Sequence, residues 1–237
     1  MPGLPGIGSP RNCTSPKVSV VLTAAVAFSL AALLLTLTPG LDTMFVVRTA
    51  IASGRRTGMV GGLGVCLGTL TWGCASAAGI TAVLVTSKVA YDALRIAGAI
   101  YLTFVGVRMF WRSRRGNPAA TEERATTAGA GWTPGVSSSG LTAFRTGLLT
   151  NLLNPKVGVF YMTLLPQFVP AHVPVFAFSV LLAAIHATEG IAWFAVLTAA
   201  TNRVRRLLMR ARVKRWLDRV TACVFIAFGV RLATENR

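Results

Sequence analysis

Two charged side chains, Asp42 and Lys156, lie within otherwise apolar stretches of the sequence. An unpaired charge at the middle of a bilayer costs about 2.5 to 3.5 kcal/mol on insertion scales, so each of them needs a reason. The carboxylate of Asp42 suits the ammonium group of an α-amino acid, and the ammonium of Lys156 suits its carboxylate. Asn154 and Thr38, which are close to these charges in the sequence, add neutral hydrogen-bonding groups. We therefore predict that these four residues bind a small zwitterion.

Each of the two charges lies next to a break in an apolar run. The first break is at Pro39 and Gly40, and the second is at Pro155. Irregular backbone at membrane depth persists only where it is buried in protein or lines a polar cavity, so paired breaks indicate a transport site. The alternative is structural: Asp42 caps the helix that follows the first break, and Lys156 pairs with it or extends to the membrane surface.

Glu189 and His186 are the other polar pair in an apolar stretch. They are three residues apart and share a helical face, and either of them, like Asp42, could carry a proton. A hydrogen-bonded pair without a role in transport explains them equally well. The four cysteines and the other histidine, His172, show no metal-ligand spacing. The sequence also shows no general base and nucleophile that could meet. We therefore expect no metal, no cofactor and no enzyme.

The composition is that of a membrane protein. The chain has 237 residues, of which 53% are hydrophobic and 13% charged, and its mean hydropathy is +0.61. This is too apolar for an ordinary soluble domain of this length. The net charge of +17 does not indicate nucleic-acid binding, because the basic residues separate long apolar runs and form no stripe with interleaved aromatics.

Six apolar segments approach the roughly 20 residues that a helix needs to cross a bilayer. Residues 42–53 form a shorter amphipathic piece that continues the first segment after its break. The sequence therefore predicts an all-α polytopic membrane protein with six transmembrane helices. The predicted segments are residues 18–38, 58–86, 90–111, 143–168, 173–200 and 216–234.

The basic residues also predict an orientation. Of the 24 lysines and arginines, 17 fall in the connections 42–57, 108–145 and 203–219. The positive-inside rule places these connections in the cytoplasm and both termini outside, whereas a five-span arrangement would move one terminus inside. Residues 202–219 either form a basic helix on the inner leaflet or serve only as a charge cluster that sets the topology.

The two halves of the chain resemble each other beyond their breaks. Gly106-Val107-Arg108 matches Gly229-Val230-Arg231, 123 residues later, and the two breaks are 116 residues apart. Either this is a chance match of short triplets or the chain holds a repeat of about 120 residues. We favour two inverted three-helix repeats with broken helices, because an odd number of spans reverses direction at each repeat. The predicted units are a disordered tail at 1–17, a first repeat at 18–111, a cytoplasmic linker at 112–139 and a second repeat at 140–237.

Several motifs occur in the order found in one known family. From about residue 22 to residue 234 the chain resembles the LysE/RhtB family of amino-acid exporters. The matching pieces are Thr38-Pro39-Gly40 with Asp42, residues 52–58 (Ala-Ser-Gly-Arg-Arg-Thr-Gly), Gly64 to Gly68, residues 98–102 with Gly106 to Arg108, Asn154-Pro155-Lys156, and residues 165–169 (Leu-Pro-Gln-Phe-Val). The resemblance implies a six-helix, multi-pass exporter of amino acids or close derivatives in the bacterial cytoplasmic membrane, driven by the proton gradient. From the two inverted halves we expect proton antiport with alternating access.

The sequence departs from the family pattern in two places. Leu41 stands where members often have a second proline, and Thr71 and Trp72 lie near a position that is often histidine. We therefore do not carry over a substrate, and we favour a neutral or weakly polar amino acid because Asp42 is the one firm carboxylate near the breaks. The expected partners are this amino acid, protons and membrane lipid, without nucleic acid. Whether the chain forms a homo-oligomer is left open. A passive channel or a structural membrane subunit is the alternative function.

Overall fold

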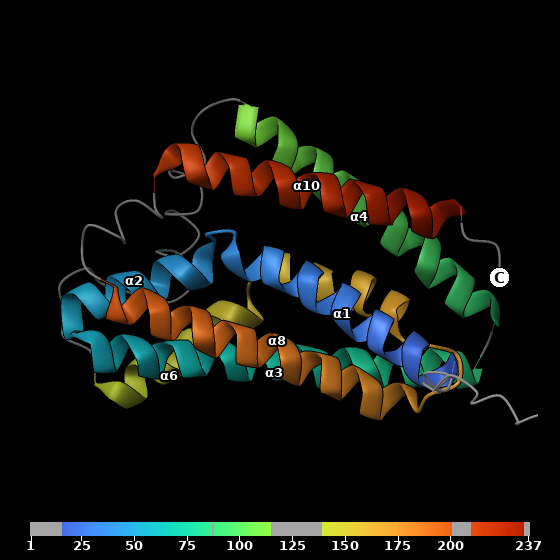
Figure 1. Ribbon diagram of the computed structural model, residues 1–237, viewed down its shortest axis with the longest axis horizontal. Helices are drawn as coiled ribbons and strands as arrows, with labels where there is room; N and C mark the ends of the chain where they lie inside the picture. The colour runs from blue at the N-terminus through green and yellow to red at the C-terminus, as the bar shows by residue number, and fades with distance from the viewer. Residues whose placement is uncertain (1–15, 87, 115–138, 201–209, 235–237) are drawn as a thin grey trace, which may run out of the picture.

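The computed structural model describes residues 16–86, 88–114, 139–200 and 210–234, and all regular structure in these ranges is helical (Figure 1). The first half contains α1 (Pro16–Leu37), α2 (Leu41–Ser53), α3 (Arg55–Thr86) and α4 (Lys88–Arg114). The second half contains α6 (Gly140–Leu152), α7 (Pro155–Val159), the π-helical turn η1 (Phe160–Leu164), the 3-10 turn η2 (Leu165–Phe168), α8 (Val175–Ala199) and α10 (Ala211–Thr234).

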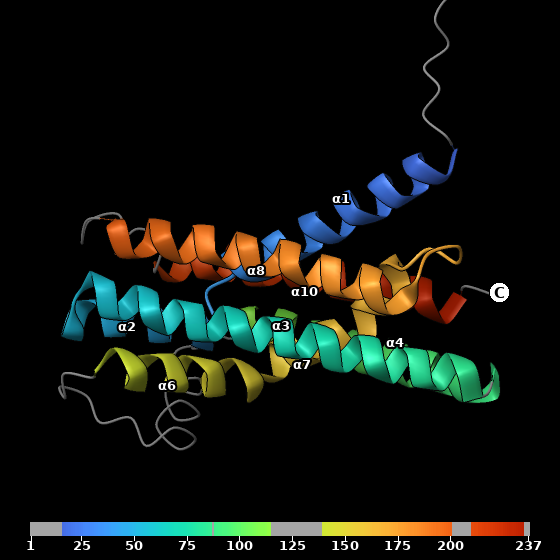
Figure 2. The same ribbon diagram turned by 90° about the horizontal axis from the view of Figure 1, so that it is seen from below.

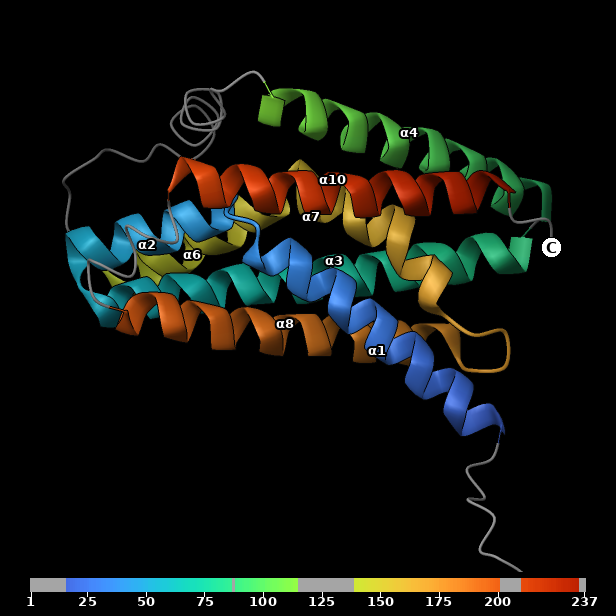
Figure 3. The ribbon, with the colours of Figure 1, turned by 45° about the horizontal axis from the view of Figure 1, so that its top comes forward.

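The long helices run along one common axis. Helix α3 packs against both α6 and α8, and α4 packs against α10. Figure 2 shows that the first turns of α1 diverge from the rest of the bundle, while its last turns approach the centre, and Figure 3 shows the same helix crossing in front of α3 and α8. The apolar core between α1, α8 and the η1–η2 segment is rich in aromatic rings, including Phe28, Phe160 and Phe168.

The predicted apolar segments correspond to helices with bounds that differ by a few residues. Three helices contain stretches long and apolar enough to cross a membrane, namely Val18–Leu37, Arg55–Gly79 and Val175–Ala199, and α4 contains a shorter one, Ile96–Trp111. The six-span arrangement therefore stays a prediction. The predicted tail and linker fall mainly on residues 1–15 and 115–138, which lie outside the described residues, as do residues 202–209 of the predicted basic helix.

Both predicted helix breaks are present. Helix α1 ends at Leu37 and α2 begins at Leu41, while α6 ends at Leu152 and Pro155 is the first residue of α7. Proline suits this first position because the backbone N–H that it lacks has no partner there within the helix. The fourth predicted segment is more irregular than expected, since a π-helical turn and a 3-10 turn follow α7. Pro166 lies in the second of these turns, where its missing N–H removes an α-helical hydrogen bond.

Helices α4 and α10 contact each other through equivalent positions. A Cβ atom on Gly106 would lie 3.0 Å from the carbonyl oxygen of Ala222, and a Cβ atom on Gly229 would lie 3.0 Å from that of Ala99. Ala99 and Ala222 are 123 residues apart, as are the two glycines. A reciprocal contact of this kind is what a two-fold axis between two helices produces.

Candidate functional site

A small polar cavity lies where the two broken helices meet. Its volume is about 50 Å³, which is enough for a few water molecules. Elements from both halves of the chain form its wall, because α1, α2 and α3 belong to the first half and α6, α7 and α8 to the second. The residues that line it are Leu35, Thr36, Thr38, Gly40, Asp42, Thr43, Val65, Cys66, Thr69, Asn151, Asn154, Lys156, Val157, His186, Gly190 and Phe194.

Asp42 connects the first break to the second. It lies in the first turn of α2, where the helix dipole favours a carboxylate. Its Oδ2 atom accepts hydrogen bonds from the Nδ2 atoms of Asn151 at 2.9 Å and Asn154 at 3.2 Å. Its Oδ1 atom is buried and has no hydrogen-bond partner among the described residues. The capping alternative for Asp42 is wrong, because the N-cap of α2 is Gly40 and no side chain caps this helix.

Asn154 serves both the local backbone and the opposite half of the chain. Its Oδ1 atom accepts a hydrogen bond from the backbone N–H of Lys156 at 3.1 Å and so caps α7. Its Nδ2 atom donates to Asp42. The two hydrogen bonds fix the orientation of this side chain, with its oxygen towards its own helix and its nitrogen towards the carboxylate.

Lys156 makes the complementary contact from the second half to the first. Its Nζ atom donates to the backbone oxygens of Leu35 at 3.3 Å and Thr38 at 3.2 Å, which belong to the end of α1. The C-terminal end of a helix is its negative end, so this location stabilises an ammonium group. The alternative in which Lys156 extends to the membrane surface is therefore wrong. The charge near each break contacts the broken helix of the other half.

The hydroxyl of Thr38 has a structural contact. Its Oγ1 atom donates to the backbone oxygen of Leu34 at 2.6 Å and lies 2.6 Å from the Oγ1 atom of Thr221 on α10. The side chain is buried, and the residue still lines the cavity. Because its one O–H is donated to Leu34, this hydroxyl could contact a substrate without opening that bond only as an acceptor.

His186 and Glu189 share a face of α8 but have different partners. The His186 Nδ1 atom lies 3.0 Å from the Tyr161 hydroxyl, and its Nε2 atom lies 3.1 Å from the Oγ1 atom of Thr36. Glu189 accepts a hydrogen bond from Ser29, and its second carboxylate oxygen is buried without a hydrogen-bond partner in the part of the chain that the structure describes. These hydrogen bonds join each residue to α1, and of the two only His186 lines the cavity.

Asn151 was not predicted as a site residue, although it is 1% exposed and donates to both Asp42 and the Oγ1 atom of Thr69. A neutral amide in an apolar run is a weaker signal than a charge, because its burial costs less. An asparagine in an apolar run three residues before Asn154, and therefore on the same helical face, was the available signal. Trp72, at the position where the chain departs from the family pattern, donates from Nε1 to the backbone oxygen of Asn151 at 3.4 Å.

Glycines bring α3 close to this site, as the spacing of Gly64 and Gly68 predicts. A Cβ atom on Gly68 would lie 2.7 Å from the Oδ1 atom of Asn151, and one on Gly64 would lie 2.0 Å from the backbone oxygen of Phe144. Because only a hydrogen atom fits at these two positions, the backbones of α3 and α6 can approach closely. The close approach places Thr69 next to Asn151.

Comparison with known proteins gives a consistent result. The sequence profile of the LysE type translocators matches residues 33–236. The threonine efflux protein of Escherichia coli (strain K12) is 30% identical to the chain over 198 residues, which are 83% of this chain and 90% of that protein. The leucine efflux protein of Klebsiella pneumoniae is 26% identical, with 86% and 91% covered, and the uncharacterized membrane protein YrhP of Bacillus subtilis is 24% identical, with 84% and 93% covered. No solved structure matches.

Proposed function

The chain belongs to the LysE type translocator family, and from this membership we propose that it is a secondary transporter that exports amino acids or close derivatives across the bacterial cytoplasmic membrane. The names of the threonine and leucine efflux relatives support this class of substrate. Proton antiport drives the export, and alternating access of the central cavity moves the substrate.

The observation that carries the proposal is the free oxygen of Asp42. The Oδ1 atom is buried at the cavity and has no hydrogen-bond partner among the described residues, while Oδ2 is held by two asparagine amides. A buried carboxylate oxygen in this state is costly unless a ligand or a proton completes it. The ammonium group of an amino acid supplies the missing donors.

The rest of the zwitterion binds at the opposite wall. The ammonium of Lys156 holds the substrate carboxylate and exchanges its contacts with the α1 carbonyl oxygens for this one. Asn154 and Thr38 line the same cavity, where Asn154 contacts Asp42 and the backbone oxygen of Thr38 contacts Lys156, and they add polar contacts to the substrate. Among the described residues of that wall Asp42 is the only carboxylate, which favours a neutral amino acid over a fully basic one.

Movement of the two halves is required by the size of the cavity. Its volume of about 50 Å³ accommodates a few water molecules but not a whole amino acid. The contacts that close it cross between the halves, from Asp42 to Asn154 and from Lys156 to Thr38. Rocking of two inverted repeats about the paired breaks would open these contacts towards one side of the membrane at a time. The reciprocal contact of Gly106 and Gly229 supports this symmetry.

Coupling follows if Asp42 binds either a proton or the substrate ammonium, but not both. Entry of a proton from outside then releases the substrate, and loss of the proton to the cytoplasm restores the carboxylate for the next substrate. In this proposal His186 and Glu189 pass the proton to or from the site, because His186 lines the cavity and Glu189 lies one helical turn further along α8.

Flux measurements in liposomes test the function. Purified protein is reconstituted with a panel of radiolabelled neutral, acidic and basic amino acids inside, and efflux is recorded with and without an imposed pH gradient. Efflux of a limited set of neutral amino acids, accelerated by the gradient, is expected. Efflux without regard to substrate or gradient would instead indicate a passive channel, and no efflux of any amino acid would indicate a structural subunit.

A further inference from the structure

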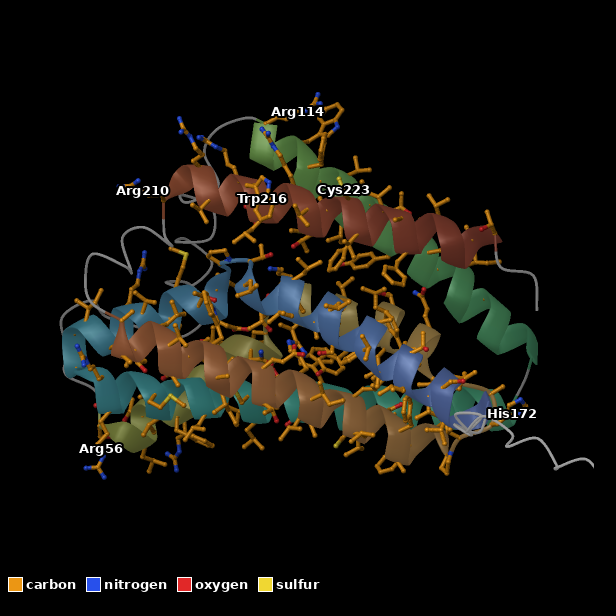
Figure 4. All side chains as sticks on the ribbon, in the orientation of Figure 1. Arg56, Arg114, His172, Arg210, Trp216 and Cys223 are labelled. Carbon is orange, nitrogen blue, oxygen red and sulfur yellow. The ribbon has the colours of Figure 1, made fainter. Side chains whose placement is uncertain are left out.

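A second cavity of about 350 Å³ lies where the end of α4 meets the beginning of α10. We call it the arginine pocket, and its lining residues are Arg114, Arg212, Arg215, Trp216 and Arg219. It shares no residue with the polar cavity between the breaks. Figure 4 shows Arg114 on α4 above Trp216 on α10, towards the end of the molecule that also carries Arg56 and Arg210.

The arginines reach this pocket because of their spacing. Arg212, Arg215 and Arg219 follow each other at intervals of three and four residues, so they lie on one face of α10. Arg114 comes from the other helix, and its guanidinium carbon lies 4.8 Å from the centre of the Phe110 ring. Four arginines line this cavity and Asp218 is the one carboxylate close to them in the sequence, so the cavity keeps a net positive charge that attracts an anion.

We propose that the arginine pocket binds the phosphate headgroup of an anionic phospholipid of the cytoplasmic leaflet. Guanidinium groups match a phosphate because they donate two parallel hydrogen bonds to its oxygens. By the positive-inside rule, the arginine-rich end of the bundle faces the cytoplasm, where the leaflet surface is negative. Trp216 is 63% exposed and belongs to the residue type that prefers the headgroup level of a membrane.

An apolar stripe next to the arginine pocket favours a lipid over free phosphate. Phe104, Val107 and Trp111 are 56%, 40% and 59% exposed and succeed one another by three or four residues along α4. Arg114 continues the same spacing at the pocket itself. A headgroup bound by the arginines would therefore have its acyl chains along exposed apolar side chains, a contact that inorganic phosphate cannot make.

Lipid binding to the full chain tests this assignment. The protein is placed in phosphatidylcholine nanodiscs with increasing fractions of phosphatidylglycerol, and bound phosphatidylglycerol is counted by native mass spectrometry. The double variant Arg215→Gln/Arg219→Gln removes two pocket charges, and Arg55→Gln/Arg56→Gln removes two exposed charges at the same end of the molecule but outside the pocket. Each well-placed cation increases the affinity for an anionic lipid about fivefold. The pocket variant should therefore bind phosphatidylglycerol roughly 30-fold more weakly at low salt, whereas the control variant should bind it nearly as tightly as the wild type.

Two further measurements separate the outcomes. The first is a folding control, in which an unchanged helical content and elution volume show that each variant is folded. The second is the single variant Arg212→Gln, which changes one exposed side chain and should weaken lipid binding about fivefold. Equal losses in the pocket and control variants would overturn the proposal in favour of diffuse attraction. Displacement of the lipid by inorganic phosphate at equal concentration would overturn the lipid assignment and make the pocket a site for free phosphate.

Discussion

Asp42 has two carboxylate oxygens with different environments. Oδ2 accepts from Asn151 and Asn154, whereas Oδ1 is buried with no hydrogen-bond partner among the described residues. This asymmetry fixes the carboxylate in place and leaves one oxygen for a ligand. A side chain held only for structure would have both oxygens paired, because an unpaired buried acceptor costs about 1 to 3 kcal/mol.

Replacement of Asp42 by Asn should abolish proton-coupled export while the protein still inserts and folds. The amide has nearly the same shape, but it neither binds the substrate ammonium as an ion pair nor exchanges a proton. Efflux with and without a pH gradient is measured, with a decrease of at least about tenfold expected for the loss of one charge-assisted hydrogen bond. The matched control is Asp218→Asn, which alters a carboxylate outside the wall of the cavity. Export at the wild-type rate in Asp42→Asn would remove this residue from the mechanism.

Substitutions at Asn154 can separate its role in capping α7 from its role in the substrate site. A serine at this position still caps α7 but cannot both accept from the backbone and reach Asp42, whereas an alanine does neither. We expect Asn154→Ser to keep near wild-type thermal stability but to lose export, and Asn154→Ala to lose about 1 kcal/mol of stability as well. Thermal unfolding in detergent and efflux are measured on both variants. If export falls only in proportion to stability, Asn154 is no more than a cap.

At the scale of elements, hydrogen bonds connect the helix break in the first half of the chain to the break in the second half. The end of α1 receives the ammonium of Lys156, and the beginning of α2 presents Asp42 to the end of α6 and the beginning of α7. Each broken helix thus satisfies polar groups that the other exposes, which is what apolar surroundings require. Helices α4 and α10 have a reciprocal contact of their own, and α10 also meets the first break through Thr221, whose hydroxyl lies 2.6 Å from that of Thr38.

That reciprocal contact predicts equal effects of two distant substitutions. A Cβ atom on Gly106 or on Gly229 would lie 3.0 Å from a backbone oxygen of the facing helix, so alanine should separate the helices in either case. We expect Gly106→Ala and Gly229→Ala each to cost about 1 to 3 kcal/mol, measured as a lower midpoint of thermal unfolding. Gly79→Ala is the control, because no atom lies within 4 Å of its Cβ position. A loss confined to one of the two variants would contradict the reciprocal arrangement.

At the scale of the whole molecule, the basic residues lie mainly towards one end of the bundle. Figure 4 shows Arg56 and Arg210 towards the left-hand end and His172 at the right-hand end, and the described parts of the two termini lie towards the end with His172 (Figure 1). An even number of membrane crossings would give this arrangement, and the positive-inside rule predicts that the arginine-rich end faces the cytoplasm.

Single cysteines introduced at these positions test the orientation. In a background with Cys13, Cys66, Cys74 and Cys223 replaced by serine, Arg56→Cys and Arg210→Cys should react with a membrane-impermeant thiol reagent only after the cells are opened. His172→Cys should react in intact cells. The readout is a mass shift on gels, and an export assay on each variant is the control for folding. Labelling of all three from the same side would contradict the six-span arrangement.

The sequence by itself determined the lengths of the helices, both breaks and the positions of Asp42 and Lys156, because apolar length, proline and charge act locally. It did not determine what those charges contact. The hydrogen bond from Asn151 to Asp42 joins residues 109 apart, and that from Lys156 to Thr38 joins residues 118 apart. The contacts of Asn151 depend on how closely α3 and α6 pack, which Gly64 and Gly68 on α3 permit. Only the tertiary structure, therefore, showed one charge held by two amides and the other by the carbonyl end of a helix.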